Sequence, residues 1–201
     1  MGSIIAFANQ KGGVAKTTTV HTLGDAFVES GKTVLVVDLD PQACLTYAMG
    51  IDPDTLDGSL HDVFAGRVKT SDVLLEFDNR PALLPSSIDL AGAEVHLLTK
   101  TGREFVLARA IKPLVGRFDY VLIDCPPSLG RLTETALRCS TEVLMPIQCE
   151  FFAMEGLTQM IQVIRRVMQR QPNQLEFGGI VLTMYDGSLE LTHEVDAEVR
   201  E

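Results

Sequence analysis

The 201-residue chain contains no tryptophan, and aromatic residues make up only 6% of it. It has no apolar run near the ~20 residues that a transmembrane helix requires, so we expect no membrane-spanning segment. No basic leader precedes the short apolar run at the N-terminus, and a signal peptide is therefore not expected. These absences favour a cytoplasmic protein.

Cysteine is scarce and shows no ligand pattern. The four cysteines, Cys44, Cys125, Cys139 and Cys149, form no C-x-x-C pair and have no metal spacing with histidine. This pattern argues against a disulfide framework and a zinc site. We expect reduced thiols, mostly acting as small core residues.

Positive charge is also in short supply. The chain has 17 lysines and arginines against 27 aspartates and glutamates, for a net charge of −10. That balance opposes a nucleic-acid-binding surface spread over the whole chain, although a local basic patch remains compatible with it. What the chain does have is 46% hydrophobic residues, enough for one domain with a full core.

Short, continuously apolar runs alternate with segments of helical periodicity. Unbroken apolar runs are typical of strands that are covered on both faces of a parallel sheet. The predicted strands are residues 3–8, 33–38, 120–125, 142–147 and 178–183, with 81–86 as a further candidate whose prolines suggest a sheet edge. The predicted helices lie near residues 17–29, 88–99, 103–115 and 153–170. This alternation predicts an α/β domain with a mostly parallel central sheet and helices on both faces.

The stretch NQKGGVAKTTT, residues 9–19, lies between the first predicted strand and the first predicted helix. It departs from the phosphate-loop pattern G-x-x-x-x-G-K-[ST], because Gln10 and Ala15 occupy the two glycine positions. Its location still suits phosphate, since a helix N-terminus presents free N–H groups and positive partial charge. Gly12 and Gly13 would let the backbone approach an anion without a Cβ.

Two side chains at the start of this helix have expected roles in such a loop. Lys16 would reach the β- and γ-phosphates, and the Thr17 hydroxyl would bind Mg²⁺. A plain strand–helix turn is the alternative interpretation. Lys-Thr-Thr directly after a glycine-rich strand exit is specific enough to favour the phosphate site.

Acidic residues end two further predicted strands. VLVVDLDPQ carries Asp38 and Asp40, and FDYVLIDCPPS carries Asp124. Ligands of open α/β sheets bind at the carboxyl ends of strands, and carboxylates there suit a Mg²⁺–phosphate site. Each aspartate alone could be a solvated strand-end residue, but three at strand ends favour a site.

The segments KGGVAKTTT, VDLDPQ and DYVLIDCPPSLG together resemble the ParA/Soj-type partitioning ATPases, whose deviant Walker A loop reads K-G-G-x-G-K-T-[ST]. PIQCEFFAMEGL (146–157) and VLTMYD (181–186) are also similar to family segments, so the resemblance covers essentially the whole chain. It implies a P-loop NTPase of the MinD/ParA type. In this family position 10 need not be glycine, whereas Lys11 is required.

The resemblance implies roles for the loop residues. Lys11 would be the signature lysine that reaches the phosphates of a partner subunit's ATP, while Lys16 would serve its own subunit. Thr17 would ligate Mg²⁺, and Thr18 would touch the α-phosphate. The implied nucleotide contacts are Lys11, Gly12, Gly13, Val14, Ala15, Lys16, Thr17, Thr18, Thr183 and Met184.

The resemblance also implies roles for two of the aspartates. Asp40 would orient or activate the attacking water and lie in the metal's surroundings, and Asp124 would hold the metal's water shell. With Lys11 and Lys16, Asp40 completes the implied catalytic set. Because phosphoryl transfer depends mainly on positioning and charge neutralisation, a lysine donated across a dimer would couple assembly to chemistry.

As a family member, the chain is expected to be a cytoplasmic ATPase that uses ATP, ADP and Mg²⁺ and forms a homodimer around ATP. Slow hydrolysis to ADP and phosphate would serve the segregation of chromosomes or plasmids, or the positioning of other cargo, with stimulation by a ParB-like protein. Two alternatives stay open. One is a nucleotide-sensing regulator that does not bind DNA, and the other is a small-molecule ATP-dependent enzyme.

Three departures from the family pattern bear on these expectations. Ala15 replaces a glycine, and a methyl group there costs ~1 kcal/mol or more if the residue needs a positive φ. Ser188 stands where family members often carry an arginine, which weakens the expectation of non-specific DNA binding and of association with the nucleoid. Family members usually continue past this point, so a P-loop ATPase domain of residues 1–201 would lack their C-terminal strand and helices.

Two charged segments complete the sequence pattern. Leu191, Val195 and Val199 share one face of the C-terminal segment, but the acidic residues around them argue against membrane binding. Three arginines cluster near the end of the long predicted helix: Arg165, Arg166 and Arg170. They are either a DNA-phosphate patch or cations that complement the helix C-terminus, and the negative net charge favours the second interpretation.

Overall fold

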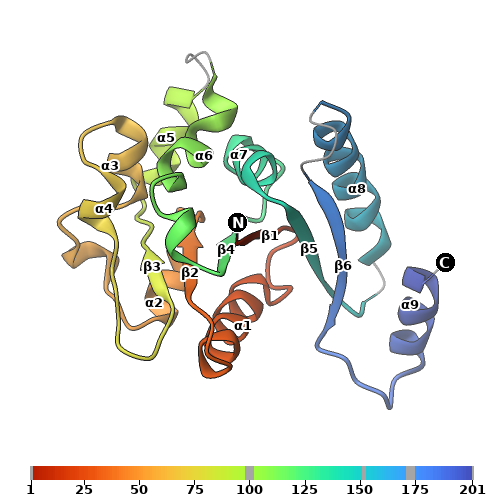
Figure 1. Ribbon diagram of the computed structural model, residues 1–201. Helices are drawn as coiled ribbons and strands as arrows, with labels where there is room; N and C mark the ends of the chain where they lie inside the picture. The colour runs from red at the N-terminus through yellow and green to blue at the C-terminus, as the bar shows by residue number, and fades with distance from the viewer. Residues whose placement is uncertain (1, 98–101, 151–152, 171–174, 201) are drawn as a thin grey trace.

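A central sheet of six parallel strands organises the molecule (Figure 1). The computed structural model describes residues 2–97, 102–150, 153–170 and 175–200, with backbone only for 94–97 and 153–155. The strands are β1 (Ser3–Phe7), β2 (Val34–Asp38), β3 (Ala82–Leu84), β4 (Tyr120–Asp124), β5 (Glu142–Gln148) and β6 (Glu176–Thr183). Their order across the sheet is β3-β2-β4-β1-β5-β6.

Helices connect and cover these strands. The α-helices of the described residues are α1 (Lys16–Glu29), α2 (Cys44–Ala48), α3 (Leu60–Ala65), α4 (Thr70–Val73), α5 (Leu90–Leu97), α6 (Val106–Ile111), α7 (Arg131–Cys139), α8 (Ala153–Arg170) and α9 (Glu190–Arg200). Short 3₁₀ turns lie at Pro53–Thr55, Arg103–Phe105 and Val115–Arg117. None of the described helices combines the length and hydropathy that a membrane crossing would need.

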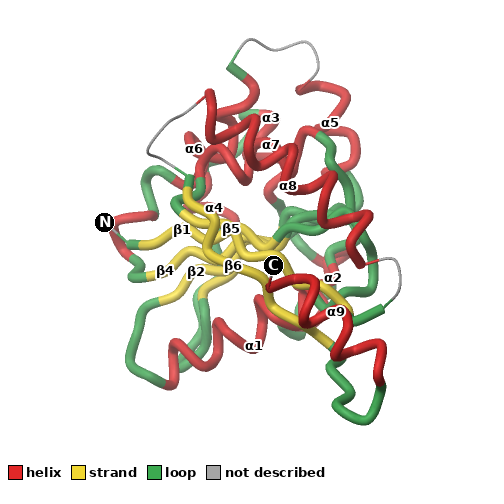
Figure 2. Tube along the Cα trace, turned by 90° about the vertical axis from the view of Figure 1, so that its right-hand side faces the viewer, coloured by secondary structure: helices red, strands yellow, loops and turns green. Residues whose placement is uncertain are grey.

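Each buried strand supplies apolar side chains to both faces of the sheet. In β2, Leu35 and Val37 join the core on one face, while Val34 and Val36 join the core on the other. Figure 2 shows α1 below the sheet and α3, α5, α6, α7 and α8 above it. This two-sided burial is the physical reason why the strands are continuously apolar in sequence.

The structure confirms all six predicted strands and the predicted α/β class. The proline-flanked strand β3 lies at one edge of the sheet, as its prolines indicate. The helices predicted near 17–29 and 153–170 are α1 and α8, and those near 88–99 and 103–115 contain α5 and α6. Residues 98, 99, 151 and 152 of the predicted segments lie outside the described residues.

The C-terminal helix α9 uses its apolar face within the molecule. Val195 is 4% exposed, and Leu191 and Val199 pack against the same core. The cysteines that the structure describes are free, with Cys125 and Cys139 buried in that core.

Strand order places several loops at one edge of the sheet. β1 lies between β4 and β5, so the chain leaves β1 toward β2 on one side and returns to β5 on the other. This arrangement makes the carboxyl end of β1 a topological switch point, where α/β sheets bind their ligands. Asp124 pairs in register with Phe7 of β1 and with Asp38 of β2, which brings the three strand ends together.

Candidate functional site

The loop between β1 and α1 is open to a ligand at its glycines. A Cβ built on Gly13, whose φ is 76°, would meet nothing within 4 Å, and one on Gly12 would meet only Pro127 Cβ at 4.0 Å. Within the part of the chain that the structure describes, no side chain forms a capping hydrogen bond at the N-terminus of α1. The open surface and the uncapped N–H groups suit an anion, as the sequence predicts.

Ala15 is the last residue of this loop and has a left-handed backbone, with φ 61° and ψ 30°. Its carbonyl accepts hydrogen bonds from the Thr19 amide (2.9 Å) and the Thr19 hydroxyl (2.7 Å), which hold the residue at the start of α1. Residue 15 therefore has the positive φ at which a methyl group is costly. Left-handed geometry disfavours alanine by roughly 1–2 kcal/mol.

Lys16 and Thr17, the first residues of α1, point to groups within the same chain. Lys16 is 7% exposed, and its Nζ donates to the Lys11 carbonyl at 2.9 Å. Burial lowers the pKa of Lys16, and the charge of Asp124 opposes that shift. The Thr17 hydroxyl donates to Asp124 Oδ2 at 2.6 Å, so the sequence-predicted lysine, threonine and aspartate form one cluster.

Asp124 is the buried carboxylate of this cluster. It is 1% exposed, and its Oδ1 atom has no hydrogen-bond partner among the described residues. Burial, followed by the nearby charge of Asp38, raises the pKa of Asp124 to about 8. A buried carboxylate oxygen without a partner, beside a threonine hydroxyl, fits the surroundings of a hydrated Mg²⁺ ion.

The described residues contain no group of three or more His, Cys, Asp or Glu side chains that could by themselves hold a metal ion. This finding agrees with magnesium chemistry, because Mg²⁺ at phosphate sites keeps several waters and takes few protein ligands. Thr17 and Asp124 are in direct contact, and Asp40 is close enough that its charge acts on the pKa of Asp124.

The two aspartates after β2 have different surroundings. Asp38 is fully buried and accepts hydrogen bonds from the Thr46 amide (2.8 Å) and hydroxyl (2.7 Å) of α2. Burial raises the pKa of Asp38 to about 6. Asp40 is partly exposed, and its Oδ1 accepts from the Gln42 amide at 2.9 Å. Asp38 therefore anchors α2 to the sheet, while Asp40 remains accessible at the site.

The Lys11 side chain pairs with a carboxylate of another segment. Its Nζ forms an ion pair with Glu150, in the loop after β5, and its amide donates to Asn9 Oδ1 at 3.0 Å. Asn9 is buried, and its Nδ2 atom donates to the Pro146 carbonyl at 2.7 Å. Sequence reasoning missed Glu150 and Asn9. The available signal for Asn9 was a polar residue directly after the apolar run of residues 3–8.

The remaining predicted contacts lie around the loop. Val14 is 1% exposed, and its carbonyl accepts a hydrogen bond from the Thr183 hydroxyl at 3.2 Å, which places the end of β6 beside the loop. Thr18 is exposed on α1. Met184 is 57% exposed and has a φ of 52°. Thr183 is thus part of the loop's support, and Met184 faces solvent.

Comparison with known proteins identifies relatives along the whole chain. Residues 2–177 match the family described as an AAA domain. The chain is 40% identical over 201 residues to the chromosome partitioning protein ParA of Myxococcus xanthus, covering 100% of this chain and 71% of that protein. The chain belongs to the ParA/Soj family of partitioning ATPases.

Two other relatives are longer than this chain, and their descriptions do not mention partitioning. An uncharacterised protein of Mycobacterium tuberculosis is 44% identical over 98% of this chain, and the chain spans 63% of the length of that relative. A solved structure described as cobyrinic acid a,c-diamide synthase from Mycobacterium smegmatis, with bound ATP analogue and magnesium, is 47% identical. It matches 100% of this chain and 82% of its own with a TM-score of 0.95.

Proposed function

We propose that this chain binds Mg-ATP at the β1–α1 loop and hydrolyses it slowly to ADP and phosphate. The observation that carries the proposal is the cluster of Lys16, Thr17 and Asp124, in which a buried carboxylate oxygen has no partner among the described residues. The M. smegmatis relative, solved with an ATP analogue and with ADP, each with magnesium, supports the same ligands.

Different residues of the chain would contact the phosphates, the metal ion and the attacking water. Residues Gly12 to Thr18 would surround the phosphates with backbone N–H groups, and Lys16 would exchange its bond to the Lys11 carbonyl for phosphate oxygens. Thr17 and Asp124 would hold the metal and its water shell. Bound Mg²⁺ supplies charge neutralisation of the phosphate oxygens. Asp40, which is partly exposed at the same edge, would orient the attacking water.

We further propose that ATP drives homodimerisation through Lys11. The Nζ of this lysine is paired with Glu150, whereas the Nζ of Lys16 bonds to the loop backbone, so the two lysines would have different phosphate partners. A second subunit that presents its phosphates opposite the loop would give Lys11 a stronger anionic partner. Hydrolysis would then require the dimer, because only the dimer neutralises the full phosphate charge.

ATP turnover measured against protein concentration tests this function. Turnover per subunit should rise with concentration, since mass action populates the competent dimer. The Lys11→Ala variant should keep monomeric ATP binding but lose both dimerisation with a non-hydrolysable ATP analogue and hydrolysis. Lys69→Ala, which removes a lysine distant in sequence from the loop, is the matched control. Normal dimerisation and turnover in Lys11→Ala would refute the sandwich mechanism.

The biological output that fits this switch is the segregation of chromosomes or plasmids, or the positioning of other cargo, in the cytoplasm with a ParB-like partner. Residues 1–201 would act as one P-loop ATPase domain. Non-specific DNA binding has weaker support, because Ser188 carries no charge and bonds to Asp186 Oδ1 through its amide (2.9 Å) and hydroxyl (2.7 Å). A salt-dependent DNA titration with and without ATP separates a DNA-bound switch from a regulator that binds protein alone.

A second candidate function follows from the description of the M. smegmatis relative. A diamide synthase would use ATP to activate carboxylates of a small molecule for amide formation. Incubation with cobyrinic acid, ATP and glutamine or ammonia, followed by mass spectrometry, tests this activity directly. Amide products that depend on Lys16 would favour the enzyme, whereas turnover of ATP without any such product would favour the switch.

A further inference from the structure

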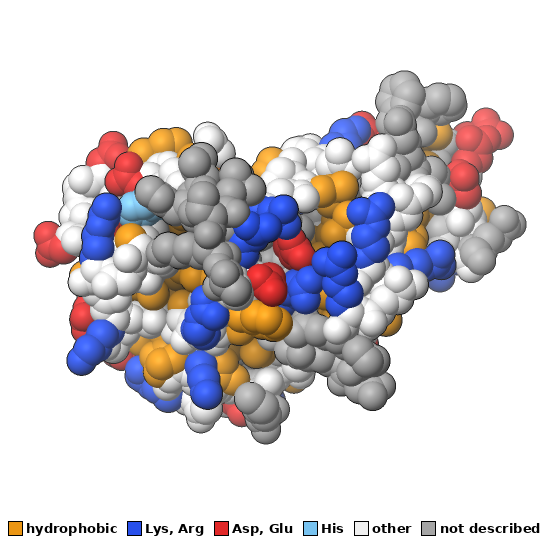
Figure 3. All heavy atoms as spheres, turned by 90° about the horizontal axis from the view of Figure 1, so that it is seen from above, with side chains coloured by type: hydrophobic (Ala, Val, Ile, Leu, Met, Phe, Trp, Pro, Cys, Tyr) orange, Lys and Arg blue, Asp and Glu red, His pale blue; other side chains and the backbone are white. Residues whose placement is uncertain are grey.

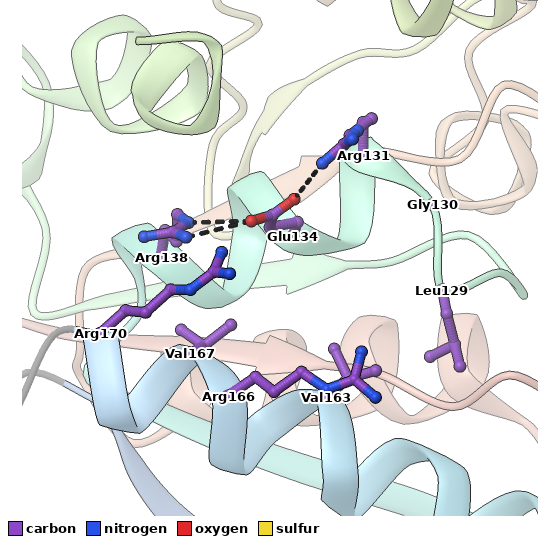
Figure 4. Close-up of a pocket in the computed structure, with 9 residues that line it drawn as sticks. All are labelled: Leu129, Gly130, Arg131, Glu134, Arg138, Val163, Arg166, Val167 and Arg170. Carbon is purple, nitrogen blue, oxygen red and sulfur yellow. Dashed lines mark hydrogen bonds and ion pairs between the residues drawn. The ribbon is translucent and has the colours of Figure 1, made fainter. Parts of the chain in front are cut away.

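A groove between α7 and α8 carries a concentration of arginines that the nucleotide site does not use. Its volume is about 440 Å³. Figure 4 shows the residues that line it. Arg131 and Arg138 line it from α7, and Arg166 and Arg170 line it from α8. In the view from above, Lys and Arg side chains gather near the middle of the surface around acidic atoms (Figure 3). Such a basic surface is unusual for a chain whose net charge is −10.

On the α7 side, a single carboxylate organises two arginines. Glu134 Oε2 accepts from Arg131 Nη1 at 2.8 Å, and Glu134 Oε1 accepts from Arg138 Nη2 at 3.1 Å and Arg138 Nε at 3.2 Å. Burial raises the pKa of Glu134, but the two guanidinium groups outweigh it and leave that pKa below its ordinary value. Arg138 is 7% exposed, so its guanidinium is held in place at the groove wall.

On the α8 side, the arginines have no such carboxylate. Arg166 and Arg170 are exposed and form no ion pair or hydrogen bond with the residues that the structure describes. Figure 4 shows Arg170 reaching from α8 toward Arg138 on the opposite wall. Four guanidinium groups thus line a groove with one carboxylate, and their mutual repulsion would be relieved by an added anion. The neighbouring Arg165 does not line the groove.

Between the arginines, the groove has apolar walls. Leu129 lies at the approach to α7, and Val163 and Val167 lie on α8. A ligand that fills this space therefore needs apolar groups as well as negative charge. DNA phosphates would pair with the arginines but would leave the valines uncovered. A peptide that carries both carboxylates and aliphatic side chains would satisfy both surfaces, because guanidinium forks match carboxylates and valines favour apolar contacts.

We propose that the α7–α8 groove binds an acidic, leucine-containing segment of a partner protein, with its carboxylates between Arg138, Arg166 and Arg170. This partner site is separate from the phosphate loop and does not depend on the proposed ATPase activity. Leu129 and Gly130 follow Asp124 in the connection from β4 to α7, so the bound segment would lie beside a loop that leaves the nucleotide site.

Fluorescence anisotropy with a labelled peptide of glutamates and interspersed leucines tests the proposal. The parental protein should bind it saturably, and the double variant Arg166→Glu, Arg170→Glu should bind at least about tenfold more weakly, since charge-assisted hydrogen bonds are lost. Arg165→Glu is the matched control on the same helix and should bind like the parent. The corresponding glutamine peptide should bind more weakly than the glutamate peptide.

Three outcomes would overturn the proposal. One is the absence of saturable binding by the parental protein. Another is an equal loss in Arg165→Glu, which would mean general charge attraction rather than a groove. The third is duplex DNA that binds more tightly than the peptide through Arg166 and Arg170, which would assign the groove to nucleic acid. Circular dichroism of each variant confirms that the fold is retained.

Discussion

The two halves of the proposed nucleotide site differ in how far the chain itself holds their side chains in place. The inner half consists of Lys16, Thr17 and Asp124. Lys16 and Asp124 are buried, and each of the three is hydrogen-bonded within the chain. Because the chain itself holds these groups together, little reorganisation would oppose the proposed binding of phosphate and metal.

The outer half consists of Lys11, Thr18 and Asp40, and it is more accessible. Thr18 is exposed, Asp40 is partly exposed, and the Lys11 side chain is 40% exposed and paired with Glu150. Under the proposed function, the inner half of one chain would bind nucleotide, whereas the accessible outer groups would act on the attacking water or on a second subunit. Four substitutions test this division.

Asp40→Ala is expected to cause the largest change, a loss of ATP hydrolysis without a loss of ATP binding. Loss of a group that positions or activates the attacking water should lower turnover by about 10²–10⁴-fold. ATP affinity should stay near the parental value, so the ATP-bound dimer should accumulate. Phosphate release and sedimentation measure the two properties, and Asp57→Ala, at an exposed loop position, is the control. Parental turnover in Asp40→Ala would remove Asp40 from the catalytic set.

Lys16→Ala should act on binding, because it removes the buried cation of the inner half. Charge-assisted hydrogen bonds contribute roughly 1.5–3 kcal/mol, which predicts a fall in ATP affinity of about 10- to 150-fold and a matching loss of turnover. Calorimetric titration measures the affinity, with Lys32→Ala at an exposed position as the control. An unchanged affinity would contradict the assignment of the whole site.

Glu150→Gln tests whether the ion pair restrains Lys11 in the single chain. Partly exposed ion pairs contribute about 0–1 kcal/mol, so releasing Lys11 should tighten ATP-dependent dimerisation by no more than about fivefold. Sedimentation with a non-hydrolysable ATP analogue measures the dissociation constant, and Glu29→Gln is the control. A weaker dimer would show instead that Glu150 itself contributes to the interface.

Ala15→Gly should have the smallest effect on ATP affinity. The φ of residue 15 is 61°, and if the loop keeps this backbone when ATP binds, glycine would relieve the same strain before and after binding. After the entropic cost of glycine, the free energy of unfolding should rise by up to about 1 kcal/mol, with little change in ATP affinity. Chemical denaturation and calorimetry measure the two quantities. A markedly tighter affinity would mean that the loop changes conformation when nucleotide binds.

Ala43→Gly provides the matched comparison for that variant. Ala43 also has a left-handed backbone, with a φ of 54°, but it is 2% exposed and lies at the start of α2 rather than in the phosphate loop. Its substitution should relieve similar backbone strain while losing a buried methyl group. A larger stability gain at position 15 than at position 43 would therefore confirm that the Ala15 methyl contributes little packing.

The amino-acid sequence by itself determined the sheet and the inner half of the site. Strands that are buried on both faces must be apolar at every position, so β1, β2, β4 and β5 were recognisable. α7 was not among the predicted helices. Its buried residues mix the apolar Leu132, Ala136 and Leu137 with polar residues such as Thr135 and Arg138, so its apolar stripe is short and interrupted. Lys16 and Thr17 were predictable because they are local in sequence to the strand exit that they serve.

Only the tertiary structure decided which distant side chains meet at this loop. Asp38 and Asp40 both follow the same apolar run in the sequence. In the fold, Asp38 is buried and accepts hydrogen bonds from Thr46, whereas Asp40 remains partly exposed. The Lys11–Glu150 pair and the Thr183–Val14 bond likewise join residues far apart in the chain. The physical reason is that local periodicity reflects the burial of each segment, whereas such contacts depend on the order in which the strands are packed.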